Sequence, residues 1–278
     1  MQHSGKRQFS VNRLRPREKE EIKEEEVPLI TESNVGQIST FLLFISTLLL
    51  YDLIVAPEGT VNFQAIKTDL ATSVHNQTEA VNIIAKSFDK LQEHDQNVNI
   101  LNFIGSTGVG KTFIANIVKR HFYSSYELRG PLHNNDHQEL ISKIKDSTSK
   151  YTLIIVDDLT LRDVDNLLAF IKDIPLEVTV LVVCIFNIQE TDKFLNHEIK
   201  YDHINKIVDK FDEAGVPHET AKFHEFSKDQ AKIWVVKQLV TKGVDLQQHS
   251  KIVESVLTQQ NIKEHGLKGL TSKILLEL

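Results

Sequence analysis

The chain has 278 residues, of which 41% are hydrophobic and 25% are charged, so it holds enough apolar material for a packed core. The formal net charge is −6, and the basic residues are spread among acidic ones, which excludes a strongly basic nucleic-acid-binding surface. We therefore expect no DNA or RNA partner. The single cysteine, Cys184, excludes an intramolecular disulfide, and its apolar surroundings predict a small buried side chain.

The N-terminal part of the chain divides into a polar tail and an apolar segment. Residues 1–37 are rich in charge and poor in aromatic residues, which predicts a disordered tail. The segment Ile38–Ala56 has nineteen residues and one formal charge, Asp52. A retained transmembrane signal-anchor is favoured because the tail is too long for an ordinary signal peptide. By length alone, the uninterrupted part, Ile38–Tyr51, also fits a signal-peptide core or a buried helix.

The lysines and arginines around this segment predict its orientation. Seven precede it, whereas Lys67 is the only one in the twenty residues that follow. The positive-inside rule then places the tail in the cytosol and the remainder in the lumen of the secretory pathway, as in a single-pass type II membrane protein. The one Asn-x-Ser/Thr sequon of the chain, Asn76-Gln77-Thr78, would be accessible to glycosylation there.

The clearest motif of the sequence follows an apolar run, Val98–Ile104, which predicts a strand. A helical pattern begins at Lys111 and extends to about Phe122. The connecting residues fit the pattern G-x-x-x-x-G-K-[ST], in the strand, loop and helix order that a phosphate-binding loop requires. The predicted ATP-binding residues are Gly105, Ser106, Thr107, Gly108, Val109, Gly110, Lys111 and Thr112.

Each residue type in this loop has a physical task. Glycines let backbone N–H groups curl around phosphates, and the N-terminus of the helix adds its dipole. Lys111 would neutralise the β- and γ-phosphate oxygens, and the Thr112 hydroxyl would bind Mg²⁺. The expected cofactors are therefore ATP and Mg²⁺.

Two further apolar runs predict buried parallel strands that end in polar residues. Tyr151–Asp158 brings Asp157 to the carboxyl end of its strand, where it would hold Mg²⁺ through water. Val178–Asn187 ends in Asn187, whose amide would orient the attacking water or contact the γ-phosphate. A turn-forming asparagine that caps the strand fits this position equally well.

The remaining chain predicts a short strand and then helices. Ala221–Phe226 is expected to form an edge strand, and Ser227 to be the N-cap of a helix over residues 228–242. In that helix the apolar positions Trp234, Val235, Leu239 and Val240 are expected in the core. The whole predicts an α/β fold: a parallel sheet with helices on both sides in residues 57–226, then a helical lid in residues 227–278.

The order strand, phosphate loop, acidic strand, asparagine strand and lid is the layout of AAA+ ATPases, and within that class residues 65–278 resemble the torsins of the endoplasmic reticulum and nuclear envelope. The resemblance is carried by "GSTGVGKT", "FIANIVKRHFY", "LIIVDDL", "IFN", "FHEFSKDQAKIWVVKQLVTKG" and "GLKGLTSKI". It places Asn187 in the sensor-1 position. Gly266 and Lys268 match the torsin Gly-Cys-Lys motif, which makes Lys268 the sensor-2 lysine, with Leu267 in place of the cysteine.

The sequence also departs from the torsin pattern. Torsins carry asparagine after the loop lysine, where this chain has Thr112. Their catalytic residue after the Mg²⁺ aspartate is glutamate, where this chain has Asp158, which is one methylene shorter. A water-positioning base displaced by about an ångström can reduce turnover by about a hundredfold.

Residues 163–278 contain no arginine, so this part of the chain cannot supply the arginine finger that AAA+ subunits usually place after sensor 1. Torsins share this lack and borrow the arginine from membrane-anchored cofactors with luminal AAA-like domains. The resemblance therefore implies such a partner, within a homo- or hetero-oligomer. Arg120, Arg129 and Arg162 lie earlier and are expected on the surface.

Three functions remain open on the sequence. The leading one is a membrane-anchored torsin-like AAA+ ATPase whose slow, partner-activated hydrolysis remodels protein or membrane assemblies in the lumen of the endoplasmic reticulum or nuclear envelope. The second is a hydrolysis-deficient nucleotide-binding scaffold that assembles with a partner in the ATP state. The third is a cytosolic P-loop protein whose apolar segment is a core or interface helix.

Overall fold

The structure is a computed structural model that describes residues 60–93, 97–132, 134–191, 193–194 and 196–278. These residues fall within a single compact unit. The predicted tail and the predicted membrane segment Ile38–Ala56 lie outside the described residues and stay predictions. In the described part of the chain, no helix has the length and apolar character needed to cross a membrane.

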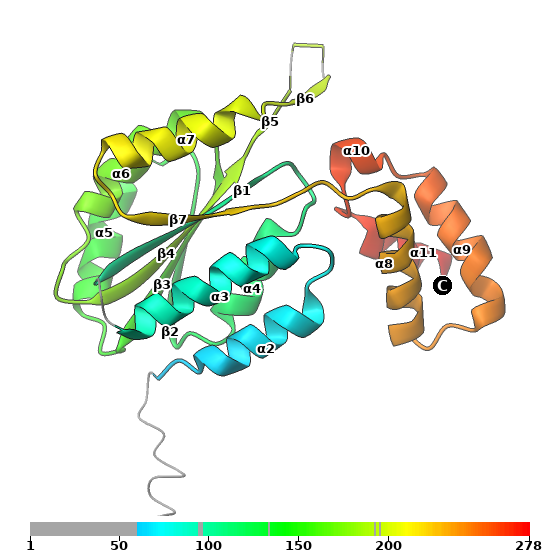
Figure 1. Cartoon of the computed structure of the whole chain (residues 1–278), viewed down its shortest axis with the longest axis horizontal. Helices are drawn as coiled ribbons and strands as arrows, with labels where there is room; N and C mark the ends of the chain where they lie inside the picture. Colours follow the sequence, from blue (N-terminus) through cyan, green and yellow to red (C-terminus); the bar gives the residue numbers. More distant parts are fainter. Residues whose placement is uncertain (1–59, 94–96, 133, 192, 195) are drawn as a thin grey trace, which may run out of the picture. The chain divides into compact units, whose positions relative to one another are not determined.

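A five-stranded, fully parallel sheet in the order β2-β3-β4-β1-β7 forms the centre of the fold (Figure 1). Because all strands run the same way, their carboxyl ends meet at one edge of the sheet, where α/β proteins bind ligands. The register places Gly105 opposite Asn187 on neighbouring strands. The strands are β1 (Val98–Gly105), β2 (Ser124–Arg129), β3 (Tyr151–Leu159), β4 (Thr179–Asn187) and β7 (His218–Lys222).

Helices cover both faces of the sheet, which explains why β3 and β4 are continuous apolar runs instead of alternating ones. Leu101 and Phe103 of β1 belong to the core on one face, and Ile100 and Ile104 belong to the core on the other. The first face is covered by α2 (Phe63–Ser73), α3 (Thr78–Glu93) and α4 (Lys111–Lys119). The second is covered by α5 (Asn134–Lys145), the short turn η1 (Leu161–Asp163), α6 (Val164–Lys172) and α7 (Asp202–Glu213).

The C-terminal helices follow β7, as the sequence predicts. They are α8 (Lys228–Thr241), α9 (Leu246–Thr258), α10 (Ile262–His265) and α11 (Leu270–Glu277). Ser227 is the N-cap of α8: its Oγ accepts a hydrogen bond from Gln230 N–H at 3.1 Å, and Gln230 Oε1 accepts one from Ser227 N–H at 2.9 Å. This capping box fixes the point where the chain leaves the sheet and enters the lid.

Several expectations need correction. The last strand lies at His218–Lys222, earlier than the predicted Ala221–Phe226, because its pairing with β1 starts at His218 opposite Ile100. The helix after the loop ends at Lys119, with Arg120 as its C-cap. Val240 is 58% exposed and outside the core, because it lies about 100° around the helix from the buried Leu239.

Other expectations about burial are confirmed. Val235 is fully buried, and Trp234 packs partly buried against the same core. Cys184 is buried in β4, and burial raises the pKa of its thiol, which keeps it uncharged. The sequence patterns did not reveal β2 or the hairpin of β5 (Gln189–Thr191) and β6 (His197–Ile199), whose residues are largely polar.

Candidate nucleotide-binding site

The phosphate loop connects the carboxyl end of β1 to the first turn of α4. Helix α4 begins at Lys111, directly after Gly110, whose φ of 100° only glycine adopts readily. The partly positive N-terminus of α4 therefore faces the loop, which is the arrangement that binds anions. The predicted strand, loop and helix order is present in the structure.

Lys111 lies buried beneath its own loop. Its Nζ donates hydrogen bonds to Gly105 O at 2.8 Å and Ser106 O at 2.5 Å. Burial lowers the pKa of Lys111 to about 8; the negative charges of Asp157 and Asp158 oppose this shift, and the positive charge of Lys268 adds to it. A triphosphate brought to this amine would favour its charged form, so the residue is suited to anion binding.

Thr112 and Asp157 form the candidate magnesium site. Thr112 Oγ1 donates a hydrogen bond to Asp157 Oδ2 at 2.9 Å, which joins the start of α4 to the end of β3. The other carboxylate oxygen, Oδ1, accepts a hydrogen bond from Asp158 N–H at 2.8 Å. Hydroxyl and carboxylate oxygens are the ligands that Mg²⁺ takes together with nucleotide phosphates, so these residues fit the ion.

Asp158, the predicted catalytic base, has an unusual backbone. Its φ is 59°, in the left-handed region, and the pairing of β3 with β4 shifts register between Val156 and Leu159. Its side chain is exposed, yet close enough to Lys111 for its charge to affect the pKa of that amine. A non-glycine residue held at positive φ is often found at functional sites.

Asn187 contacts both its own turn and the phosphate loop. Its Oδ1 accepts a hydrogen bond from Gln189 N–H at 3.1 Å, which is the turn-type contact that the sequence allowed. Its Nδ2 donates to Thr107 Oγ1 at 3.2 Å, so the amide also reaches the loop. The structure therefore brings Asn187 to the predicted site, and its part in hydrolysis stays a prediction.

The lid meets the phosphate loop through backbone contacts. Leu267 N–H donates a hydrogen bond to Gly108 O at 3.0 Å. A Cβ atom added to Gly108 would lie 1.9 Å from His265 O, and one added to Gly266 would lie 2.6 Å from Gly108 O. Both positions therefore require glycine. Lys268 is the residue after Leu267 and is exposed. Its positive charge helps to lower the pKa of Lys111, so the predicted lysine lies near the phosphate loop.

Two glutamines complete the site, and the sequence patterns missed both. Gln77 is buried; its Nε2 donates to Val109 O at 3.2 Å and to His224 O at 2.8 Å. His224 N–H donates back to Gln77 Oε1 at 3.2 Å. Gln189 contacts a different residue of the loop: its Oε1 accepts a hydrogen bond from Thr107 N–H at 3.2 Å. Neither glutamine belongs to a nucleotide-binding motif, so no local signal could have assigned them to this site.

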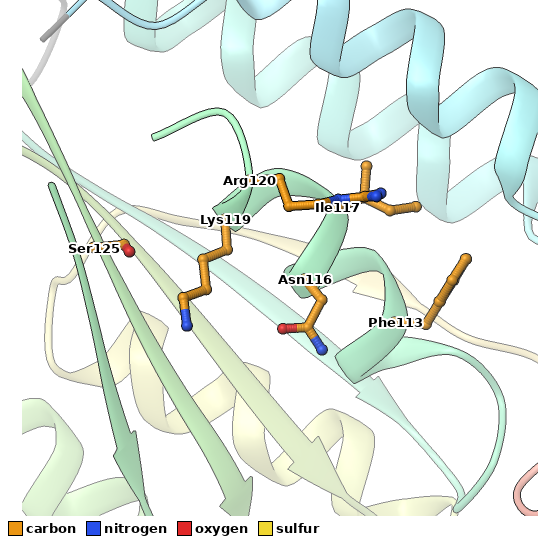
Figure 2. A pocket seen from close by; sticks show the side chains of 6 residues that line it. All are labelled: Phe113, Asn116, Ile117, Lys119, Arg120 and Ser125. Carbon is orange, nitrogen blue, oxygen red and sulfur yellow. The ribbon is translucent and has the colours of Figure 1, made fainter. Parts of the chain in front are cut away.

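An open hollow of about 530 Å³ lies beside α4, and none of the residues that line it is a predicted site residue (Figure 2). It is lined by Phe113, Asn116, Ile117, Lys119 and Arg120 of α4 and by Ser125 of β2. Arg120, Arg129 and Arg162 are all exposed, as expected for surface residues. The phosphate loop and its partners, not this hollow, define the candidate site.

Comparison with solved structures identifies the class of fold. The chain is similar to Hsp104, an AAA+ ATPase, in a closed-state complex with ATPγS and FITC casein, with a TM-score of 0.52 and 12% sequence identity. The match covers 78% of this chain and 45% of that chain, so the chain spans less than half the length of its neighbour. At this identity the match shows the fold alone: a parallel α/β sheet flanked by helices, like that of this AAA+ ATPase.

Comparisons of the amino-acid sequence with known families and proteins found no match. No protein family matches the chain, and no curated protein matches it either.

Proposed function

We propose that this chain is an AAA+ ATPase that binds ATP with Mg²⁺. One observation carries the proposal: the Thr112 hydroxyl and the Asp157 carboxylate, 45 residues apart in sequence, meet at 2.9 Å beside the buried Lys111 amine. This arrangement provides a cation for the phosphates and oxygen ligands for the metal at the N-terminus of α4. Bound Mg²⁺ would offset the charge of the phosphates there.

The direct test is nucleotide binding. We expect the wild-type protein to bind labelled ATP only weakly without Mg²⁺, and Lys111→Ala to lose binding by about a hundredfold or more, because a charge-assisted contact to phosphate is removed. Lys119→Ala is the matched control, since Lys119 lies on the same helix but pairs with Glu127 on the surface. Equal and negligible binding by all three proteins would refute the proposal.

We further propose that hydrolysis is slow and depends on a partner that donates an arginine, as the resemblance to torsins implies. The absence of arginine from residues 163–278 supports this proposal. The work done by hydrolysis would be the remodelling of protein or membrane assemblies. Phosphate release measured with and without a candidate AAA-like membrane cofactor tests it, and a rise of about 10³-fold or more is expected from a supplied arginine.

Asp158 favours a second candidate, a scaffold that binds nucleotide without turnover. It is one methylene shorter than glutamate and has a φ of 59°, so its carboxylate is placed by a strained backbone. Such a protein would assemble with its partner in the ATP state only. Normal ATP binding combined with no phosphate release, with or without the partner, would select this candidate.

We propose a luminal location for the described residues, with Ile38–Ala56 as the membrane anchor. The charge asymmetry around that segment and the exposed side chain of Asn76 in its sequon support the proposal. In sealed microsomes, we expect the C-terminal part to resist protease and to show an endoglycosidase shift that Asn76→Gln abolishes. Complete digestion without detergent would instead indicate the cytosolic alternative.

A further inference from the structure

Gln189, the first residue of β5, lies where three parts of the candidate site meet. Its Oε1 accepts a hydrogen bond from Thr107 N–H of the phosphate loop at 3.2 Å. Its Nε2 donates one to Glu264 O, at the end of the lid helix α10, at 3.1 Å. Its backbone N–H donates to Asn187 Oδ1 at 3.1 Å. One residue thus connects the phosphate loop, the lid and the asparagine that ends β4.

The chemistry of this position requires an amide. Thr107 N–H offers only a hydrogen and Glu264 O offers only lone pairs, so the bridging side chain must accept on one side and donate on the other. Glutamate cannot donate when ionised, and leucine can do neither. The backbone before Gln189 is also fixed, because Ile188 is buried and its N–H donates to Gly105 O at 3.3 Å.

We propose that Gln189 is a positioning residue that couples the lid to the phosphate loop and to Asn187. The part of the lid concerned is the end of α10 and the residues that follow it, Glu264–Lys268, called the lid loop below. In its coupling to bound nucleotide, this inference rests on the proposed function. Leu267 N–H joins the lid loop directly to Gly108, and Gln189 supplies a connection through a different lid atom, Glu264 O. A displacement of the lid loop then either breaks the Gln189–Glu264 bond or moves the glutamine, and with it Thr107 and Asn187.

Two variants separate the hydrogen bond of Gln189 to Thr107 from its hydrogen bond to Glu264. Gln189→Leu has nearly the same size and removes both side-chain hydrogen bonds. Gln189→Glu retains the acceptor for Thr107 N–H but loses the donor to Glu264 O. The matched controls are Gln248→Leu and Gln248→Glu, since Gln248 is an exposed lid residue whose side chain makes no hydrogen bond within the described part of the chain.

The first measurement is hydrogen exchange of the full-length, nucleotide-free protein, resolved to single amides. In Gln189→Leu, we expect the Thr107 and Leu267 amides to exchange about tenfold faster, because each loses a bond or a neighbour that holds it. In Gln189→Glu, only Leu267 should accelerate. The Gln248 variants should match the wild-type protein at both amides.

Two results would overturn the proposal at this stage. One is exchange of both amides in Gln189→Leu at rates within about twofold of the wild-type rates, because a lost hydrogen bond should speed local opening by more than that. The other is equal acceleration at both amides in Gln189→Leu and Gln189→Glu together with faster exchange throughout α8 and α9, which would indicate general loosening instead of a specific connection.

The second measurement repeats the exchange with ATP and Mg²⁺. In the wild-type protein, we expect the phosphate loop and the lid loop to gain protection together; in Gln189→Leu, the phosphate loop should gain protection without the lid loop. Joint protection in Gln189→Leu would overturn the coupling. If the wild-type protein gains no protection and binds no ATP, the proposed function fails, while the nucleotide-free exchange still decides whether Gln189 holds the two loops together.

Discussion

Lys111 combines two demands that oppose each other. The buried position lets its amine bond to Gly105 O and Ser106 O, but the same burial lowers its pKa to about 8 in the nucleotide-free protein. A phosphate group at the site would favour the charged amine and raise the pKa again. Nucleotide binding is therefore expected to be linked to proton uptake at this one side chain.

We predict that ATP affinity falls as the pH rises through about 8, the pKa of Lys111 in the free protein. The sign follows from linkage: the complex holds the proton more tightly than the free protein, so raising the pH disfavours the complex. Calorimetric titrations near pH 8, in two buffers of different ionisation enthalpy, should show uptake of about half a proton. Lys111→Arg, which stays charged, should bind ATP without this pH dependence. A pH-independent wild-type affinity between pH 7 and 9 would contradict the prediction.

Asp158 is held in a conformation that costs energy for any side chain with a Cβ atom. Its φ of 59° is adopted by aspartate more readily than by most residues but suits glycine best. The side chain is exposed, so little packing is lost if it is removed. An exposed residue in a strained backbone conformation is expected to contribute to the function of the site and not to the stability of the fold.

We predict that Asp158→Gly leaves the free energy of unfolding unchanged or raises it by about 0.5 kcal/mol, because glycine relieves the backbone strain. Urea denaturation measures this. ATP binding should remain within about threefold of wild type, while any phosphate release is lost if Asp158 has its predicted role of positioning the attacking water. A loss of stability above about 1 kcal/mol would show that the carboxylate makes a stabilising contact instead.

At the scale of elements, the lid loop and the phosphate loop cross at two glycines. Gly108 and Gly266 come from segments far apart in the sequence, and neither has room for a Cβ atom. The direct bond from Leu267 N–H to Gly108 O forms at this crossing. The position of α10 and the conformation of the phosphate loop are thus set together by backbone contact.

We predict that Gly108→Ala destabilises the protein by about 2 kcal/mol or more and weakens ATP binding at least about tenfold, because its methyl group would displace the lid loop. Gly243→Ala is the matched control: Gly243 has a φ of 70°, similar to the 76° of Gly108, but nothing within 4 Å of an added Cβ. It should lose only the cost of the backbone strain, about 1 kcal/mol. Equal losses in both variants would rule out the crossing as a steric contact.

Element prediction from the sequence succeeded for central strands and was incomplete at the edges. β1, β3 and β4 are apolar runs because both of their faces are covered, and this composition is visible without the structure. β2 is an edge strand with the polar sequence Ser-Ser-Tyr-Glu-Leu-Arg, and its pairing with β3 depends on a neighbour distant in sequence. β7 is also polar, which is why the predicted bounds of this strand lie later in the sequence than the observed ones.

At the scale of the described molecule, the lid and the sheet belong to one connected cluster of buried apolar side chains. The core on the α3 face contains Leu101 and Phe103 of β1 together with Val235, Leu239 and Leu270 of the lid helices. Helices α8, α9 and α11 pack mainly on one another, and the cluster continues from them to the sheet through residues such as Leu267 of the lid and Val109 of the phosphate loop. The lid is expected to be part of one cooperative unit.

We predict that calorimetry of a fragment over residues 57–278 shows one unfolding transition, because lid and sheet belong to one connected apolar cluster. ATP with Mg²⁺ should raise the midpoint of the whole transition, by an amount that grows with the logarithm of ligand concentration over Kd. The Lys111→Ala variant should keep the single transition and lose the shift. Two separate transitions, with only one responding to nucleotide, would show that lid and sheet unfold independently.

The sequence by itself determined the parts of this protein that local patterns encode. Gly105 to Thr112 predict a phosphate loop because that chemistry requires these residue types in consecutive positions, and Asp157 and Asn187 were predicted as site residues because each ends an apolar strand. Only the tertiary structure decided which distant residues join them. Gln77, Gln189 and the Gly108–Gly266 crossing depend on segments brought together by sheet order and lid packing, and ordinary glutamines and glycines carry no sign of such contacts in the sequence.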